Sequence, residues 1–166
     1  MILGMSISAF TTLHVIISLV AIVLGLVWVS DLLRGRQSSL IVGLFLVTTI
    51  LTSVTGFMFP ASAVTPAHIV GGISLVALAA AVLALYAFGL RGVWRPVFLV
   101  TAVLSLYLNI FVGVVQAFQK IGALTALAPT QSETPFVIAQ SAVLVLAIIV
   151  CWLALRRFRG GGMSAA

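Results

Sequence analysis

Five long apolar stretches account for most of this 166-residue chain. Each is about 20 residues or longer and contains no charged side chain, which suits a helix that crosses the hydrocarbon core of a bilayer. Only 6% of the residues are charged, whereas soluble domains carry about 25%. We therefore expect an all-α integral membrane protein, a single membrane domain with five transmembrane helices over residues 7–30, 38–59, 66–90, 96–118 and 135–156.

The basic residues are distributed unevenly between the two sides of a chain that crosses the membrane five times. Lys120 lies in the fourth connection. The first connection, the third connection and the tail hold the others, which are Arg34, Arg36, Arg91, Arg95, Arg156, Arg157 and Arg159. Because cytoplasmic connections are enriched in Lys and Arg, this bias predicts that the N-terminus lies outside and the C-terminus lies in the cytoplasm.

The fourth connection, residues 119–135, is the longest. Apolar residues recur at every third position over Ile121–Leu127, which predicts a short interfacial helix between the fourth and fifth transmembrane helices. The pairs Thr65-Pro66 and Thr134-Pro135 are typical of a helix N-cap followed by a proline in the first turn. The third and fifth transmembrane helices are therefore expected to begin at these pairs.

Strongly hydrogen-bonding side chains are confined to the halves of the helices that this topology places in the outer leaflet. Polar groups inside a membrane are costly and are therefore candidates for function. The candidates for ligand binding are Asn109, Gln116 and Lys120 from the fourth helix and Gln140 from the start of the fifth. One hypothesis is a polar pocket that opens outward, with Lys120 as its positive rim. The alternative is that the amides form interhelical hydrogen bonds and that Lys120 reaches the lipid headgroups.

Two histidines, His14 and His68, lie in the outer parts of the first and third helices. In a structural interpretation, each bonds to a hydroxyl or amide of a neighbouring helix, or to interfacial water in the case of His68. In a functional interpretation, the two imidazoles ligate one b-type haem, and Gly71-Gly72 leaves room for the flat macrocycle. A quinone or another hydrogen-bonded ligand is a further alternative. For a single metal ion, two histidines without a cysteine or an intramembrane carboxylate are an incomplete ligand set.

Several classes of function lack the residues that they need. The two acidic residues, Asp31 and Glu133, both lie outside the predicted spans, whereas proton-coupled transporters use intramembrane carboxylates. The apolar inner halves of the helices provide no polar path for a channel through one subunit. We do not expect an enzyme, because no nucleophile–base set, metal–carboxylate cluster or nucleotide-binding loop is evident. The basic residues are too scattered for a nucleic-acid surface.

A resemblance to known proteins is carried by LHV at Leu13–Val15, LTSVTGF at Leu51–Phe57, LYLNIFVGVVQAF at Leu106–Phe118 and ALAPTQSETPF at Ala126–Phe136. Together these segments resemble a family of short, uncharacterised bacterial polytopic inner-membrane proteins. The resemblance implies a bacterial inner-membrane setting and brings no activity, cofactor or site residue. In addition, His68 followed by Gly71-Gly72 resembles four-helix cytochromes of the b561 type, but the other helices lack the further histidines of a two-haem member.

We therefore expect a multi-pass protein of the bacterial inner (plasma) membrane that acts as a non-enzymatic accessory or binding subunit. Its partners would be the lipid bilayer and other membrane subunits, or further copies of itself. One alternative is an electron-transfer protein that holds a single haem b between His14 and His68, or a quinone. Another is a small-solute carrier or an oligomeric channel. Colour, co-purification with partners and solute flux into liposomes distinguish these functions.

Overall fold

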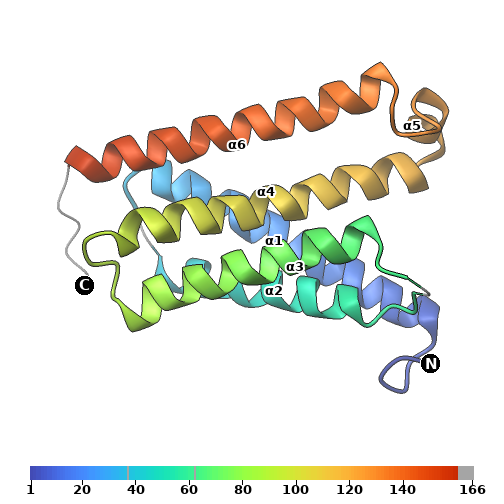
Figure 1. Cartoon of the computed structure of the whole chain (residues 1–166), viewed down its shortest axis with the longest axis horizontal. Helices are drawn as coiled ribbons and strands as arrows, with labels where there is room; N and C mark the ends of the chain where they lie inside the picture. The colour runs from blue at the N-terminus through green and yellow to red at the C-terminus, as the bar shows by residue number, and fades with distance from the viewer. Residues whose placement is uncertain (37, 62, 161–166) are drawn as a thin grey trace.

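The computed structural model describes residues 1–36, 38–61 and 63–160, without the side chains of residues 158–160. Five long helices lie side by side in this part of the chain (Figure 1): α1 (Ile7–Leu33), α2 (Ser39–Phe57), α3 (Pro66–Val82), α4 (Trp94–Lys120) and α6 (Thr134–Gly160). A π-helical turn, η1 (Leu83–Ala87), extends α3, and the short helix α5 (Gly122–Leu127) follows α4. Each of the five candidate spans, with η1 counted in the third, contains an 18-residue window with a mean hydropathy of at least 2.1. The prediction of an all-α chain with five candidate membrane spans and a short helix in the fourth connection is confirmed.

The helix ends differ from the predicted ones by a few residues, for local reasons. Thr65 caps α3 as predicted, because its hydroxyl accepts a hydrogen bond from the His68 N–H and Pro66 opens the helix. α6 begins at Thr134 itself rather than after it, and the Glu133 carbonyl accepts the first helical bonds. The third span stops at Ala87 instead of residue 90, because Gly89 and Leu90 both have a φ of 55° and cannot continue the helix.

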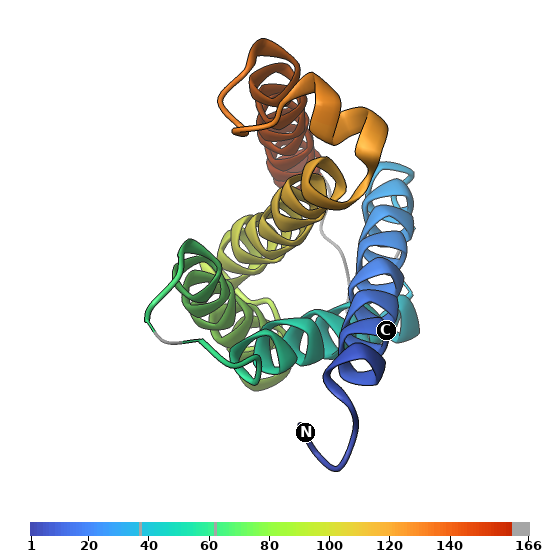
Figure 2. The ribbon, with the colours of Figure 1, turned by 90° about the vertical axis from the view of Figure 1, so that its right-hand side faces the viewer.

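Helix α4 is the central helix of the bundle. It packs against α3 and α6 along much of its length and also contacts α1 and α2. In the view along the helices (Figure 2), α2 lies between α1 and α3, and α6 lies beside α4 at the edge of the bundle. Successive helices are therefore neighbours up to α4, and the short helix α5 lies in the connection between α4 and α6.

Aromatic side chains of α1, α2 and α4 pack together in the core. The indole of Trp28 stacks on Phe45, with ring centroids 5.4 Å apart, and meets Phe98 edge-on at 5.9 Å. One turn earlier, a Cβ atom on Gly25 would lie 2.5 Å from Leu106 Cδ1 and 2.9 Å from Phe45 Cε2. Gly25 therefore permits a helix approach that any side chain would prevent, as small residues do in membrane bundles.

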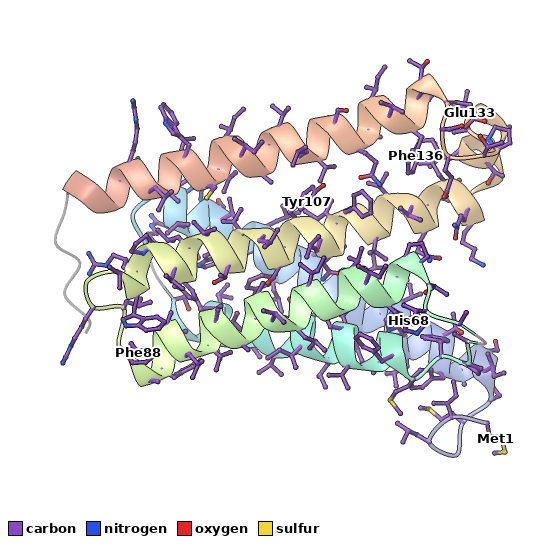
Figure 3. All side chains as sticks on the ribbon, in the orientation of Figure 1. Met1, His68, Phe88, Tyr107, Glu133 and Phe136 are labelled. Carbon is purple, nitrogen blue, oxygen red and sulfur yellow. The ribbon has the colours of Figure 1, made fainter. Side chains whose placement is uncertain are left out.

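The two ends of the bundle differ in charge. α1 ends and α2 begins at the same end as the turn from η1 to α4 and the last turns of α6 (Figure 1). We call this the basic end, since all seven arginines of the sequence belong to these segments. The opposite end holds the N-terminus, the connection from α2 to α3, and α5. Figure 3 shows Phe88 at the basic end and His68, Glu133 and Phe136 at the opposite end.

Glu133 organises the connection between α5 and α6. Its Oε1 accepts hydrogen bonds from the Thr130 N–H at 3.1 Å and from the Thr130 hydroxyl at 2.9 Å, and its Oε2 accepts one from the Ser132 N–H at 3.1 Å. Desolvation acts to raise the pKa of this carboxyl, but the hydrogen bonds outweigh it and hold the pKa below its ordinary value. They do so because they stabilise the charged form.

Glu133→Gln is expected to loosen this connection and leave the bundle intact, because a carboxamide has one acceptor oxygen where the carboxylate has two. At neutral pH, we expect amide hydrogen exchange at Thr130 and Ser132 to be about threefold faster in the variant. Since the folded-state pKa of Glu133 is lowered, its contribution is present at neutral pH and is lost as the pH falls through that pKa. Below that pKa, the exchange rates of the variant and the wild type should become equal. Equal exchange rates at neutral pH would contradict this role for Glu133.

Candidate functional site

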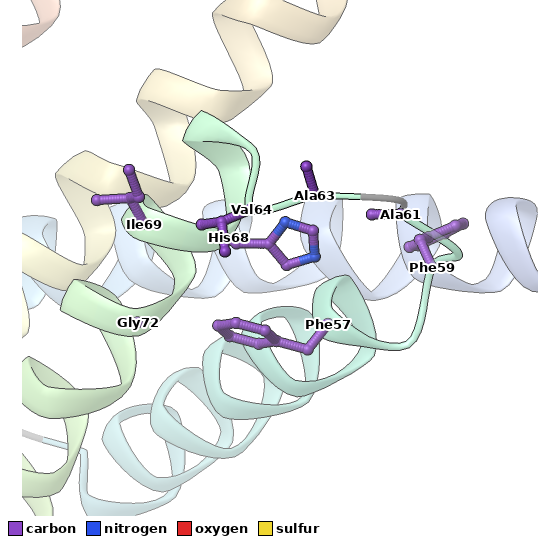
Figure 4. A pocket seen from close by; sticks show the side chains of 8 residues that line it. All are labelled: Phe57, Phe59, Ala61, Ala63, Val64, His68, Ile69 and Gly72. Carbon is purple, nitrogen blue, oxygen red and sulfur yellow. The ribbon is translucent and has the colours of Figure 1, made fainter.

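An open hollow lies where α2 ends and α3 begins, at the end of the bundle opposite the arginines (Figure 4). Its volume is about 590 Å³, which is in the range of small-molecule sites. The lining residues are Phe57, Phe59, Ala61, Ala63, Val64, His68, Ile69 and Gly72. The walls are therefore apolar and partly aromatic, and one imidazole is the only polar side chain among these lining residues.

His68 is positioned by the first turn of α3. The Thr65 hydroxyl accepts a hydrogen bond from the His68 N–H at 3.4 Å, and the Thr65 N–H donates to His68 Nδ1 at 3.1 Å. The two residues thus form a reciprocal capping box, with histidine at the position that Glu or Gln usually takes. The ring packs on Phe57 with centroids 5.5 Å apart, and Figure 4 shows it projecting into the hollow.

The capping box fixes the proton of the His68 imidazole. A backbone N–H only donates, so Nδ1 of His68 is the acceptor of the bond from Thr65. The neutral ring therefore carries its proton on Nε2. His68 combines a structural role at Nδ1 with a single N–H donor, Nε2, on a ring that lines the hollow.

The two glycines that follow His68 have different surroundings. A Cβ atom on Gly71 would lie 3.0 Å from Phe57 Cε2, so Gly71 allows the Phe57 ring to pack against α3. A Cβ atom on Gly72 would have nothing within 4 Å, and Gly72 lines the hollow. The space expected beside Gly71-Gly72 is therefore occupied by Phe57 at the first glycine and open at the second.

His14 faces the last turns of α2. Its Nδ1 lies 2.7 Å from Thr55 Oγ1, and its ring meets Phe59 edge-on with centroids 5.2 Å apart. The Thr55 hydroxyl donates its one hydrogen to the Leu51 carbonyl at 2.6 Å. Both bonds form together when His14 Nδ1 is the donor. The tautomer that satisfies this network therefore has its proton on Nδ1, the opposite of His68.

The two imidazoles pack against different aromatic residues. Phe59 packs on His14 and Phe57 packs on His68, and α2 separates α1 from α3. Among the described residues, no hydrogen bond or ring contact joins His14 to His68. A metal-ligating histidine donates its other ring N–H to a neighbour; His14 Nδ1 does so, whereas His68 Nδ1 accepts a bond. Haem ligation by His14 and His68 together therefore stays a prediction.

The four other residues predicted to bind a ligand lie in different surroundings. Asn109 is buried, with 8% of its surface exposed, and its Nδ2 has no hydrogen-bond partner in the part of the chain that the structure describes. Gln116 and Lys120 are exposed on α4. Gln140 donates from Nε2 to the Phe111 carbonyl at 3.2 Å, which is an interhelical bond between α6 and α4. A ligand site formed by these four residues therefore stays a prediction.

Two features of this end of the bundle were missed by the sequence reasoning. Gln131 Nε2 donates to the Val115 carbonyl at 3.1 Å, so Gln131 and Gln140 bind successive turns of α4. The aromatic wall of the hollow, Phe57 and Phe59, was also missed. Its signal in the sequence was a pair of aromatic residues at the end of the second apolar stretch, directly before Pro60.

No group of three or more His, Cys, Asp or Glu side chains that could hold a metal ion occurs among the described residues. No protein-family model, no curated protein and no solved structure matches the chain. By the length and hydropathy of its five long helices, the chain is a polytopic membrane protein. The hollow at His68 is a candidate site of this chain.

Proposed function

We propose that this chain is a non-enzymatic binding subunit of the bacterial inner membrane whose ligand occupies the hollow at His68. The ligand would be a small apolar molecule that carries a hydrogen-bond acceptor, such as a quinone. The observation that carries the proposal is the His68 imidazole, whose Nδ1 is engaged by the cap, among the apolar and aromatic walls that the other described lining residues form. A carbonyl oxygen is complementary to the remaining Nε2–H of that imidazole, and the rings of Phe57 and Phe59 suit a flat, apolar body.

We further propose that the basic end faces the cytoplasm. The proposal is supported by the position of all seven arginines in the segments at that end, since positively charged connections are retained on the cytoplasmic side. This orientation places the N-terminus outside. It also opens the hollow at His68 to the outer leaflet, where membrane-soluble molecules enter laterally.

An accessory role within a larger membrane complex is supported by α6. In its most apolar window no residue is buried, although the corresponding windows of the other four spans all contain buried residues. α6 packs mainly on α4, so the rest of its surface is available to another subunit or to a second copy of the chain. Under this proposal, purification in a mild detergent retains a partner subunit, which a strong detergent removes.

The ligand site is tested by magnetic resonance with isotope-labelled histidine, because the chain holds two histidines and gives two imidazole signals. We expect a short-chain quinone, decylubiquinone, to shift the signal of His68 and leave that of His14 unchanged. Gly72→Leu fills the hollow at a position with no neighbour within 4 Å. It should weaken quinone affinity by about tenfold or more, which is 1.4 kcal/mol of binding free energy.

Gln116→Leu is the matched control, since Gln116 is exposed on α4 and lies outside the hollow. It should bind the quinone as the wild type does. Unchanged affinity in Gly72→Leu would contradict the site. Loss of affinity in Gln116→Leu or Gln140→Leu would instead favour the polar pocket expected from the sequence. A haem spectrum that disappears in both His14→Ala and His68→Ala would replace quinone binding by electron transfer.

A further inference from the structure

The basic end carries a large excess of positive charge. Seven arginines and one carboxylate, that of Asp31, belong to the segments at this end. The second acidic residue of the chain, Glu133, lies at the opposite end. Asp31 therefore leaves most of the arginine charge uncompensated. A dense positive charge beside a membrane surface attracts anionic headgroups.

The turn between α1 and α2 lies beside an arginine that is distant in the sequence. Gly35 has a φ of 73°, which reverses the chain directly after α1. The Arg157 Nη1 atom of α6 lies 3.8 Å from the position of a Cβ atom on Gly35. Arg34 and Arg36 flank this glycine, and both are exposed, as is Arg157. Arg157 of α6 thus lies beside the turn that carries Arg34 and Arg36.

Trp152 and Arg156 indicate the depth of this arginine group in the membrane. The guanidinium carbon of Arg156 lies 3.9 Å above the Trp152 ring, and 49% of the Trp152 surface is exposed. Exposed tryptophans of membrane proteins sit at the boundary between hydrocarbon and headgroups. Arg157 follows Arg156 directly and is exposed as well.

We propose that the Gly35 turn and the last turns of α6 form a binding site for the headgroup of an anionic phospholipid, such as phosphatidylglycerol. Arg34, Arg36 and Arg157 bind the phosphate, since guanidinium groups match phosphate oxygens in charge and in bidentate geometry. The acyl chains lie along the exposed apolar surface of α6, which includes Ile149 and Leu153. The site does not depend on the hollow at His68, which lies at the other end of the bundle.

Native mass spectrometry of the full chain tests this site directly. The protein is taken from vesicles of phosphatidylcholine with about 20 mol% phosphatidylglycerol, so that the two lipids compete for the site. The wild type should retain phosphatidylglycerol in preference to phosphatidylcholine. In the double variant Arg34→Gln/Arg157→Gln, we expect the affinity for phosphatidylglycerol to fall by about twentyfold.

Lys120→Gln is the control, because it removes one positive charge at the opposite end of α4. It should retain phosphatidylglycerol as the wild type does. Equal retention of the two lipids by the wild type would overturn the proposal, as would an equal loss in Lys120→Gln.

A measurement on the wild type alone covers the case in which the double variant does not fold. Raising the salt from about 0.1 M to about 1 M should strip the bound phosphatidylglycerol, and retention at high salt would contradict recognition by the arginines.

Discussion

Gly25→Leu is expected to destabilise the bundle more than any other single substitution proposed for this chain. The Cβ atom alone would lie 2.5 Å from Leu106 Cδ1 and 2.9 Å from Phe45 Cε2, and Phe45 is fully buried. A leucine at this position therefore forces α1 away from α2 and α4. Overpacking of this kind costs about 3 kcal/mol or more, which is a large share of the stability of a small domain.

The measurement is unfolding in mixed detergent micelles, followed by the near-ultraviolet signal of the packed tryptophans. Helix content is expected to persist, because each span satisfies its own backbone hydrogen bonds in an apolar solvent. Gly72→Leu is the matched glycine substitution, since nothing lies within 4 Å of its Cβ position. It should unfold within about 0.5 kcal/mol of the wild type. Similar midpoints for Gly25→Leu and Gly72→Leu would show that α1 does not pack as closely as described.

Trp28→Ala is the second substitution with a large expected effect. Trp28 is 2% exposed, stacks on Phe45 and meets the edge of Phe98, so its removal leaves a cavity between three helices. Lipid tails are as apolar as the core, and the lost free energy is therefore that of packing rather than of burial from water. We expect a loss of about 3 kcal/mol, at the low end of the range for tryptophan truncation in cores.

Two further variants separate the ring from its N–H group. Trp28 Nε1 is buried and has no hydrogen-bond partner among the described residues, so Trp28→Phe keeps much of the stacking and removes an unsatisfied donor. It should be considerably more stable than Trp28→Ala. Trp152→Ala, at an exposed indole, should change the unfolding midpoint little. A Trp28→Phe variant as unstable as Trp28→Ala would mean that the indole N–H is satisfied in the folded protein.

The candidate site shows where sequence reasoning reaches its limit. Thr65 and Pro66 were identified as the start of a helix because capping depends on neighbouring residues. The same local signal could not reveal that His68 completes the cap, or which imidazole nitrogen is left to donate. Nor could it reveal that His14 bonds to Thr55 of α2. Asn109, Gln116 and Lys120 share a helix, yet one is buried and two are exposed.

The sequence by itself determined that this chain forms five apolar helices joined by short connections, with its arginines in alternate connections and the tail. The physical reason is local: an apolar stretch of bilayer length must satisfy its backbone internally, and any such stretch does so as a helix. The tertiary structure decided which faces meet, with Phe57 against Gly71, Trp28 against Phe45, and Arg157 beside Gly35. Almost every face of these helices is apolar, so hydropathy does not distinguish the packed faces from the lipid-facing ones. Steric fit and a few hydrogen bonds make that choice.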